Sequence, residues 1–327
     1  MFQIRKILVP TDYSNCAEAA LMHALHLAEA LGAEVHVLHV VEGGIAYDHD
    51  RIMPEVSADL AGIYARREPR GETGGDADAC WNEVPVRRIE RERIEATPAI
   101  LEYGQEHDVD LIVLGTHGHR SVDRFLSDVE DHWPIGKTAE QVIKLADRPV
   151  FTVGPRSSRM PELVERVLAP VDFSGHARRA LTYAKHLAWL YGVPLHVLHV
   201  LEGAEAGEAA PSEEAVLDAL KQFYDSAEGP EVEMLPVVRR GTPSREILKA
   251  AGRDRSGIIV LSSHGRKGWD ERRLGKEAEQ IIRAAPCPVF TDKAFGKSLL
   301  RSEPGEKNLR DDPPPVKARP RLRSAAS

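Results

Sequence analysis

The chain has 327 residues and a formal net charge of −8 at pH 7. This length allows two domains of about 150 residues, each able to bury a core without disulfides or structural metal ions. No apolar run approaches the ~20 residues of a membrane-spanning helix, the N-terminus lacks a signal-peptide pattern, and the three cysteines share no metal-ligand spacing. We therefore expect a cytoplasmic protein with no membrane contact.

The first part of the chain predicts a strand, a helix and a second strand. The apolar run at 4–9 ends at Pro10 and is typical of a buried parallel strand. Small and apolar residues then recur at helical spacing, beginning after Ser14, a good N-cap, and ending before Gly32. The next strand is expected at 35–41. Strand, helix and strand in this order form a βαβ unit, which implies a parallel sheet.

The following residues predict the remaining elements of the same kind of domain. We expect a strand at 83–89, a helix at 98–106, a strand at 110–114, a helix at 138–146 and a last strand at 149–153. Between the second and third strands, a helix is expected at 55–67. The stretch GETGGDADAC, residues 71–80, is expected to be flexible.

The second half of the chain repeats the first half. ILVPTDYSNCAEAALMHALHLAEALGAEVHVLHVVEG, from Ile7, aligns without a gap with VLAPVDFSGHARRALTYAKHLAWLYGVPLHVLHVLEG, from Val167, and about half of the positions are identical. The strands and helices of this copy are expected at 164–169, 174–191, 194–201, 212–227, 231–238, 243–252, 257–261, 275–285 and 288–291. Two copies of one domain imply two copies of any site.

The end of the chain has a different character. Residues 293–327 contain nine Lys and Arg, four Asp and Glu, and three consecutive prolines. This composition predicts a disordered basic tail. The remaining body is acidic, which disfavours nucleic acid as a partner. We therefore expect one domain at 1–155, a second at 163–292, and the tail at 293–327.

A ligand site is expected at the carboxyl ends of the strands, where open parallel sheets bind their ligands. Asp12 follows the first strand and is placed to accept hydrogen bonds from ribose hydroxyls. Gly115 and Gly118 follow the fourth strand, and Gly136 precedes a helix, so their backbone N–H groups can approach a phosphate. The nucleotide-binding residues that we expect are Asp12, Val40, Gly115, Gly118, Gly136 and Lys137 in the first copy, and Asp172, Val200, Ser262, Gly265, Gly275 and Lys276 in the second.

Motifs in both copies resemble those of the universal stress protein family. ILVPTDYS, LHVVEG, DLIVLGTHG and GKTAEQVI occur in the first copy, and VLAPVDFS, LHVLEG, GIIVLSSHG and GKEAEQII occur in the same order in the second. The resemblance covers 3–154 and 163–292 and implies a tandem two-domain member. It implies two Rossmann-like α/β domains (adenine nucleotide alpha hydrolase-like), each a five-stranded parallel sheet of order 3-2-1-4-5.

The resemblance also implies an ATP-binding pattern, from which both copies depart. The pattern is Gly, two residues, Gly, nine residues, Gly, and then Ser or Thr. The second copy has the spacing, but begins with Ser262 and ends with Lys276. The first copy has seventeen residues between Gly118 and Gly136, including the acidic stretch SDVEDHWP at 127–134. Acidic side chains repel a triphosphate, so we expect the second copy to be the preferred nucleotide site.

Together these features predict a stress-response protein that binds ATP or another adenine nucleotide, with Mg²⁺ as an accompanying ion. We expect a regulatory or protective module without catalytic or metal-binding residues, and at most weak ATP hydrolysis. The expected partners are the nucleotide and an unidentified protein, and the two halves are expected to pair as an internal pseudo-dimer or to form a homodimer. His36 and His39 are interpreted as interior residues.

Two alternatives stay open at this point. The duplicated fold can serve as a protein-interaction scaffold that needs no nucleotide. The other alternative is an enzyme of the ATP-pyrophosphatase-like group, which hydrolyses or adenylates. Such enzymes carry an SGGxDS-like loop after the first strand, and PTDYSN and PVDFSG lack its glycines.

Overall fold

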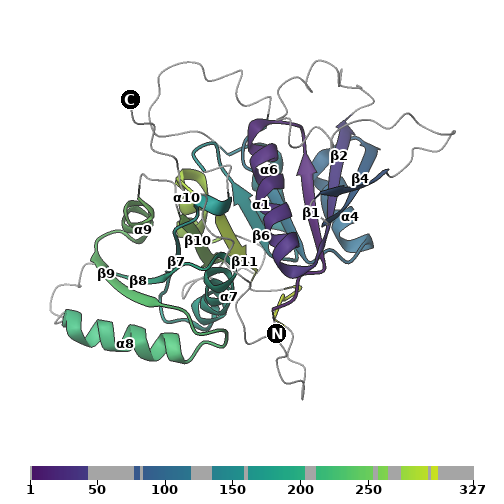
Figure 1. Ribbon diagram of the computed structural model, residues 1–327. Coiled ribbons are helices and arrows are strands. Elements are labelled where there is room, and N and C mark those ends of the chain that lie inside the picture. Colours follow the sequence, from purple (N-terminus) through teal and green to yellow (C-terminus); the bar gives the residue numbers. More distant parts are fainter. Residues whose placement is uncertain are drawn as a thin grey trace, which may run out of the picture.

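The computed structural model describes residues 2–42, 77–81, 84–118, 135–157, 161–202, 211–252, 257–263, 274–293 and 296–300. These residues form one sheet of eleven strands in the order β3-β4-β2-β1-β5-β6-β11-β10-β7-β8-β9. Neighbouring strands are parallel except at β3–β4 and at β6–β11. Figure 1 shows β9 at one end of the molecule and β4 toward the other.

The second half has its strands and helices in the order that the sequence predicts, and the first half has one further strand, β3. The first half contains β1 (Lys6–Thr11), α1 (Asn15–Leu31), β2 (Glu34–Glu42), β3 (Ala77–Trp81), β4 (Val84–Arg93), α4 (Ala96–Glu106), β5 (Leu111–Gly115), α6 (Lys137–Leu145) and β6 (Val150–Val153). After a short 3-10 turn at Pro161–Leu163, the second half contains β7 (Arg166–Pro170), α7 (Gly175–Tyr191), β8 (Leu195–Leu201), α8 (Glu213–Asp225), β9 (Met234–Arg240), α9 (Pro243–Ala251), β10 (Gly257–Ser262), α10 (Lys276–Ala284) and β11 (Val289–Asp292).

The expectation of five parallel strands in each half is wrong for the first half. Strand β3 pairs antiparallel with β4, so this half has six strands. It occupies the end of the stretch 71–80 that was expected to be flexible. The glycine-rich residues before β3 favour a loop, whereas the strand itself is an edge strand that pairs with the backbone of β4. The helix expected at 55–67 lies outside the described residues.

Strands β6 and β11 join the two halves with an internal twofold register. Phe151 lies opposite Phe290, which is its equivalent in the repeat, and their ring centroids are 6.5 Å apart. Thr152 is opposite Val289 on one side, and Val150 is opposite Thr291 on the other. The last strands are therefore neighbours, as the expected internal pairing of the two halves requires.

The apolar residues form one core on each face of this sheet. Successive residues of β1 alternate, with Ile7 and Val9 in the core under α1, α7 and α8, and Leu8 in the core under α4, α6, α9 and α10. Each core contains residues of both halves. Side chains on a strand point alternately to the two faces, so the near-continuous apolar runs of the sequence fill both layers.

The prediction of a disordered tail from Lys293 is wrong for its first residues. The side chains of Lys293 and Leu299 are buried, and Leu300 forms an isolated bridge with Phe2. Figure 1 shows the last described residues, in yellow, beside the N-terminus. These residues pack because Leu299 joins the apolar core and Phe2 lies against the same core, with its ring centroid 6.2 Å from that of Tyr183. Residues 301–327 lie outside the described residues.

Candidate functional site

The same turn follows the first strand of each half. The backbone N–H of Ser14 donates to Asp12 Oδ1 at 3.1 Å, and the N–H of Ser174 donates to Asp172 Oδ1 at 3.0 Å. Each serine then caps its helix, because its Oγ accepts from the N–H three residues later at 3.3 Å in α1 and 3.1 Å in α7. The turn therefore fixes both carboxylates at the carboxyl edge of the sheet.

The residue inside each turn has a left-handed backbone. Tyr13 has φ 63° and Phe173 has φ 60°, a conformation that bulky residues rarely adopt. Their rings lie against His39 and His199, at centroid distances of 4.8 and 4.6 Å. Strain retained at one place in both halves indicates a constraint on this turn. The repeated letters DYS and DFS were the only sequence signal for it.

The loop after β5 closes onto the Asp12 turn. Ser14 Oγ donates to the backbone oxygen of His117 at 3.2 Å. A Cβ atom on Gly118 would overlap Asp12 Oδ2, so the glycine lets the backbone lie against the carboxylate. Gly115 is equally restricted, because its Cβ would lie 2.7 Å from the backbone carbon of Cys16. The structure thus brings Asp12, Gly115 and Gly118 together as predicted.

Helices α6 and α10 begin at this edge with a glycine N-cap and no side-chain cap. The N–H of Gly136 donates to Thr116 O at 2.8 Å, and the N–H of Gly275 donates to Ser263 O at 2.9 Å. These two N–H groups are therefore engaged in the loop, which corrects the expectation that Gly136 itself is a phosphate donor. The donors of the first turn begin at the next residue, which is a lysine in both halves.

The remaining predicted residues lie around the same two edges. Lys137 and Lys276 are exposed first residues of α6 and α10. Val40 and Val200 are half-buried on β2 and β8, next to the strands that carry the aspartates. Ser262 ends β10 in the place of Gly115. Gly265 and the acidic stretch 127–134 lie outside the described residues.

The strand histidines are interior residues with polar partners, as predicted. His36 Nδ1 lies 2.8 Å from the Tyr103 hydroxyl, and its Nε2 lies 3.2 Å from Glu34 Oε1. Burial lowers the pKa of His36, while Glu34 opposes that change. His39 Nδ1 lies 2.9 Å from Thr11 O. Among the described residues, no cluster of His, Cys, Asp and Glu could hold a metal ion.

The sequence of this chain matches the model of one protein family twice. The model of the Universal stress protein family matches residues 3–154 and again residues 164–292. The chain belongs to the universal stress protein family. The two matches fall on the two halves of the sheet, so the protein is a tandem member with two copies of the family's domain.

Similar proteins include both single-domain and tandem members. A universal stress protein of Methanocaldococcus jannaschii is 31% identical over 155 residues, which are 46% of this chain and 81% of that protein. One of Mycobacterium tuberculosis is 23% identical over 295 residues, 87% of this chain and 95% of that protein. The crystal structure of a universal stress protein from Archaeoglobus fulgidus has a TM-score of 0.59 at 24% identity, covering 89% of this chain and 99% of that one.

In the part of the chain that the structure describes, every helix is too short or too polar to cross a membrane.

Proposed function

We propose that each half of this universal stress protein binds an adenine nucleotide at the carboxyl edge of its strands, and that the protein is a cytoplasmic regulatory or protective module rather than an enzyme. The duplicated aspartate turn carries the proposal. Asp12 and Asp172 are each held by a serine N–H, and in the first half Gly118 of the loop after the fourth strand lies against Asp12. A carboxylate fixed in this place can accept hydrogen bonds from neighbouring ribose hydroxyls.

The helix N-termini of α6 and α10 supply the phosphate end of the proposed site. A helix N-terminus attracts anions, and a cation there is unfavourable by about 0.3–1 kcal/mol. Both halves nevertheless place an exposed lysine, Lys137 or Lys276, at the first helical position. A phosphate bound between the helix and the lysine would offset that repulsion. Because a lysine replaces the hydroxyl of the family pattern, we expect binding to need little Mg²⁺ and hydrolysis to be slow.

The second half is the stronger candidate. Its loop has the family length between Gly265 and Gly275, and it lacks the acidic stretch that the first half carries at 127–134. Three carboxylates near a triphosphate would cost binding energy unless a divalent ion lay between them. Deleting 127–134 should therefore raise the nucleotide affinity of the first half.

The test begins with the protein as purified. Mass spectrometry of the denatured full-length chain should detect a co-purifying adenine nucleotide, and calorimetric titration with ATP, ADP and AMP should give saturable binding. Absence of both would contradict the proposal. That result would favour a scaffold that binds proteins. Such a scaffold needs no free N–H groups at Gly136 and Gly275, both of which donate to backbone oxygens within the protein.

A further inference from the structure

The segment after β11 crosses from the second half onto the first half. We call Lys293 and residues 296–300 the clasp. The Lys293 ammonium donates to Ile143 O at the last turn of α6, and the backbone N–H of Lys297 donates to Asp147 O at 2.6 Å. Leu299 is 1% exposed, and its carbonyl accepts from the N–H of Gln3 at 3.0 Å. The segment after β11 thus reaches the first described residues of the chain.

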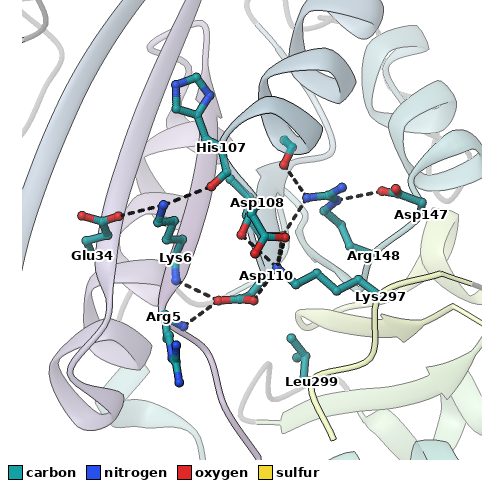
Figure 2. Close-up of polar contacts among 12 residues, drawn as sticks. Arg5, Lys6, Glu34, His107, Asp108, Asp110, Asp147, Arg148, Lys297 and Leu299 are labelled. Carbon is teal, nitrogen blue, oxygen red and sulfur yellow. Dashed lines mark hydrogen bonds and ion pairs between the residues drawn. The ribbon is translucent and has the colours of Figure 1, made fainter. Parts of the chain in front are cut away.

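The side chain of Lys297 is held by an oxygen-rich receptor on the first half. Its ammonium lies 2.7 Å from Asp108 Oδ1 and 2.7 Å from Asp110 Oδ1, and it donates to Val109 O at 3.2 Å. The other oxygen of Asp110 accepts from the backbone N–H groups of Arg5 and Lys6 at 2.7 and 3.0 Å (Figure 2). Asp110 therefore connects the clasp to the start of β1.

A glycine makes the close approach possible. Gly296 has φ 105°, and a Cβ atom at this position would overlap the carbonyl oxygen of Asp147. Only a residue without a side chain can adopt this backbone and pass so near to the first half. Gly296 is thus a steric requirement of the clasp that is independent of charge.

The acidic residues of the receptor do not recur at the aligned positions of the second half. In the repeat, Arg255, Gly257 and Pro286 stand at the positions of Asp108, Asp110 and Asp147. The three aligned positions of the second half therefore carry no acid, although Asp254 precedes Arg255 in a loop that is two residues longer. This difference between the halves fits the presence of one clasp, which docks on the first half.

The clasp and the covalent linker occupy equivalent places in the internal repeat. The linker leads from the end of β6 to the start of β7, and the clasp leads from the end of β11 to the start of β1. We propose that the clasp is a second, non-covalent connection, which closes the two halves into a ring and keeps β11 paired with β6 of its own chain.

The pairing of β6 with β11 explains why a second connection between the halves would matter. The β6–β11 register is symmetric about Phe151 and Phe290, so β6 of one chain could pair with β11 of another just as well. A docked clasp holds β11 near its own β6 and so raises the effective concentration of the internal pair. Without it, the linker and the β6–β11 interface itself would hold the two halves of one chain together, and the halves could exchange between chains.

Amide hydrogen exchange of the full-length protein tests whether the clasp is docked. The amides of Gln3 and Leu299 report it directly, because they donate to Leu299 O and to the Tyr183 hydroxyl. We expect Gly296→Ala to raise exchange at both amides at least tenfold. Gly175→Ala is the matched control, because a Cβ there meets open space, and it should leave both unchanged. Unchanged protection in Gly296→Ala would overturn the proposal.

A second variant separates charge from steric effects and tests chain exchange. Lys297→Met keeps the apolar stem and removes the ammonium, whereas Lys221→Met alters an exposed lysine of α8 as a control. Two differently tagged preparations of Lys297→Met, mixed and incubated, should co-purify at least tenfold more than wild-type preparations. Far-UV circular dichroism should show that the variant is folded. Loss of clasp protection without chain exchange would refute the role in pairing.

Discussion

At the scale of single residues, Asp172 combines a structural role with its proposed binding role. Asp172→Asn keeps an oxygen that can accept from Ser174 N–H, so the turn should survive, but the charge is lost. Charge-assisted hydrogen bonds are worth about 1.5–3 kcal/mol, so we expect adenine-nucleotide affinity at the second half to fall about 10- to 150-fold. Titration calorimetry measures this, with Asp12→Asn as the matched variant of the weaker site. Equal affinity in Asp172→Asn and wild type would remove Asp172 from the site.

Asp292 gives the second prediction at this scale. It is 1% exposed and pairs with Arg179 Nε at 2.6 Å. Burial raises its pKa to about 6, although Arg179 opposes the shift. A carboxyl whose folded pKa exceeds the unfolded value near 4 binds its proton more tightly in the folded state. The folded state therefore loses stability as pH rises through the folded pKa, by about 2 kcal/mol between pH 4 and pH 6.

The substitution Asp292→Asn should abolish that decline. Urea unfolding midpoints measured from pH 4 to 7 should show it as a difference in slope between variant and wild type. Burial lowers the pKa of His186 to about 4, which gives the opposite slope over the same range. Because His186 is present in both proteins, the difference isolates Asp292. Parallel pH profiles would show that the pKa of Asp292 is not raised.

The sequence could identify the site residues that the repeat displays twice. Asp12 and Asp172 stood out because each follows a strand and recurs at the same place. The acidic receptor could not be found this way, because Asp110 and Lys297 are 187 positions apart and only one half has the pair. The engaged N–H of Gly136 also escaped prediction, because its acceptor, Thr116 O, is a backbone atom that any residue supplies.

At the scale of elements, helices α6 and α10 face each other across the internal twofold axis. Four charged residues form ion pairs within and between the two helices. Within the helices, Glu140 pairs with Lys144 at 2.6 Å and Glu279 with Arg283 at 2.8 Å. Between the helices, Arg283 lies 3.2 Å from Glu140, and Lys144 lies 3.8 Å from Glu279. These four are equivalent pairs of the repeat, so the arrangement is symmetric. All are partly exposed, which limits their contribution through solvent screening.

Removing one acid of this group should have a small, salt-dependent effect. Glu279→Gln breaks contacts with both Arg283 and Lys144, and we expect a loss below about 1 kcal/mol in the free energy of unfolding. The loss should disappear in 1 M NaCl, where charges are screened beyond about 3 Å. Asp218→Asn, which breaks one exposed pair with Lys221, is the control and should have no measurable effect. A loss that persists in high salt would indicate packing rather than charge.

The order of elements was predictable because local patterns specify them. Apolar runs locate the buried strands, and Ser14 and Gly32 act at the ends of α1 as the sequence indicates. Strand β3 was missed because it has only five residues and follows the glycine-rich run GETGGD, which favours a loop. Its pairing depends on the backbone of β4, which composition does not reveal.

At the scale of the whole molecule, both cores contain residues of the two halves, so packing across the β6–β11 interface supports each half. The ends of the ring are already adjacent, since Gln3 N–H bonds to Leu299 O at 3.0 Å. A circular permutant can therefore begin at Pro161, run through Leu300, join a short glycine-rich segment to Phe2, and end at Ser157. Joining ends that lie together adds little loop-closure entropy, and the new ends fall at the former linker.

We expect this permutant to fold with a free energy of unfolding within about 1 kcal/mol of a chain truncated after Leu300, which controls for loss of the tail. Chemical denaturation of both proteins measures the difference. A permutant that fails to fold, while the truncated control folds, would mean that the two connections are not equivalent and that the ring is not the organising feature of this tandem protein.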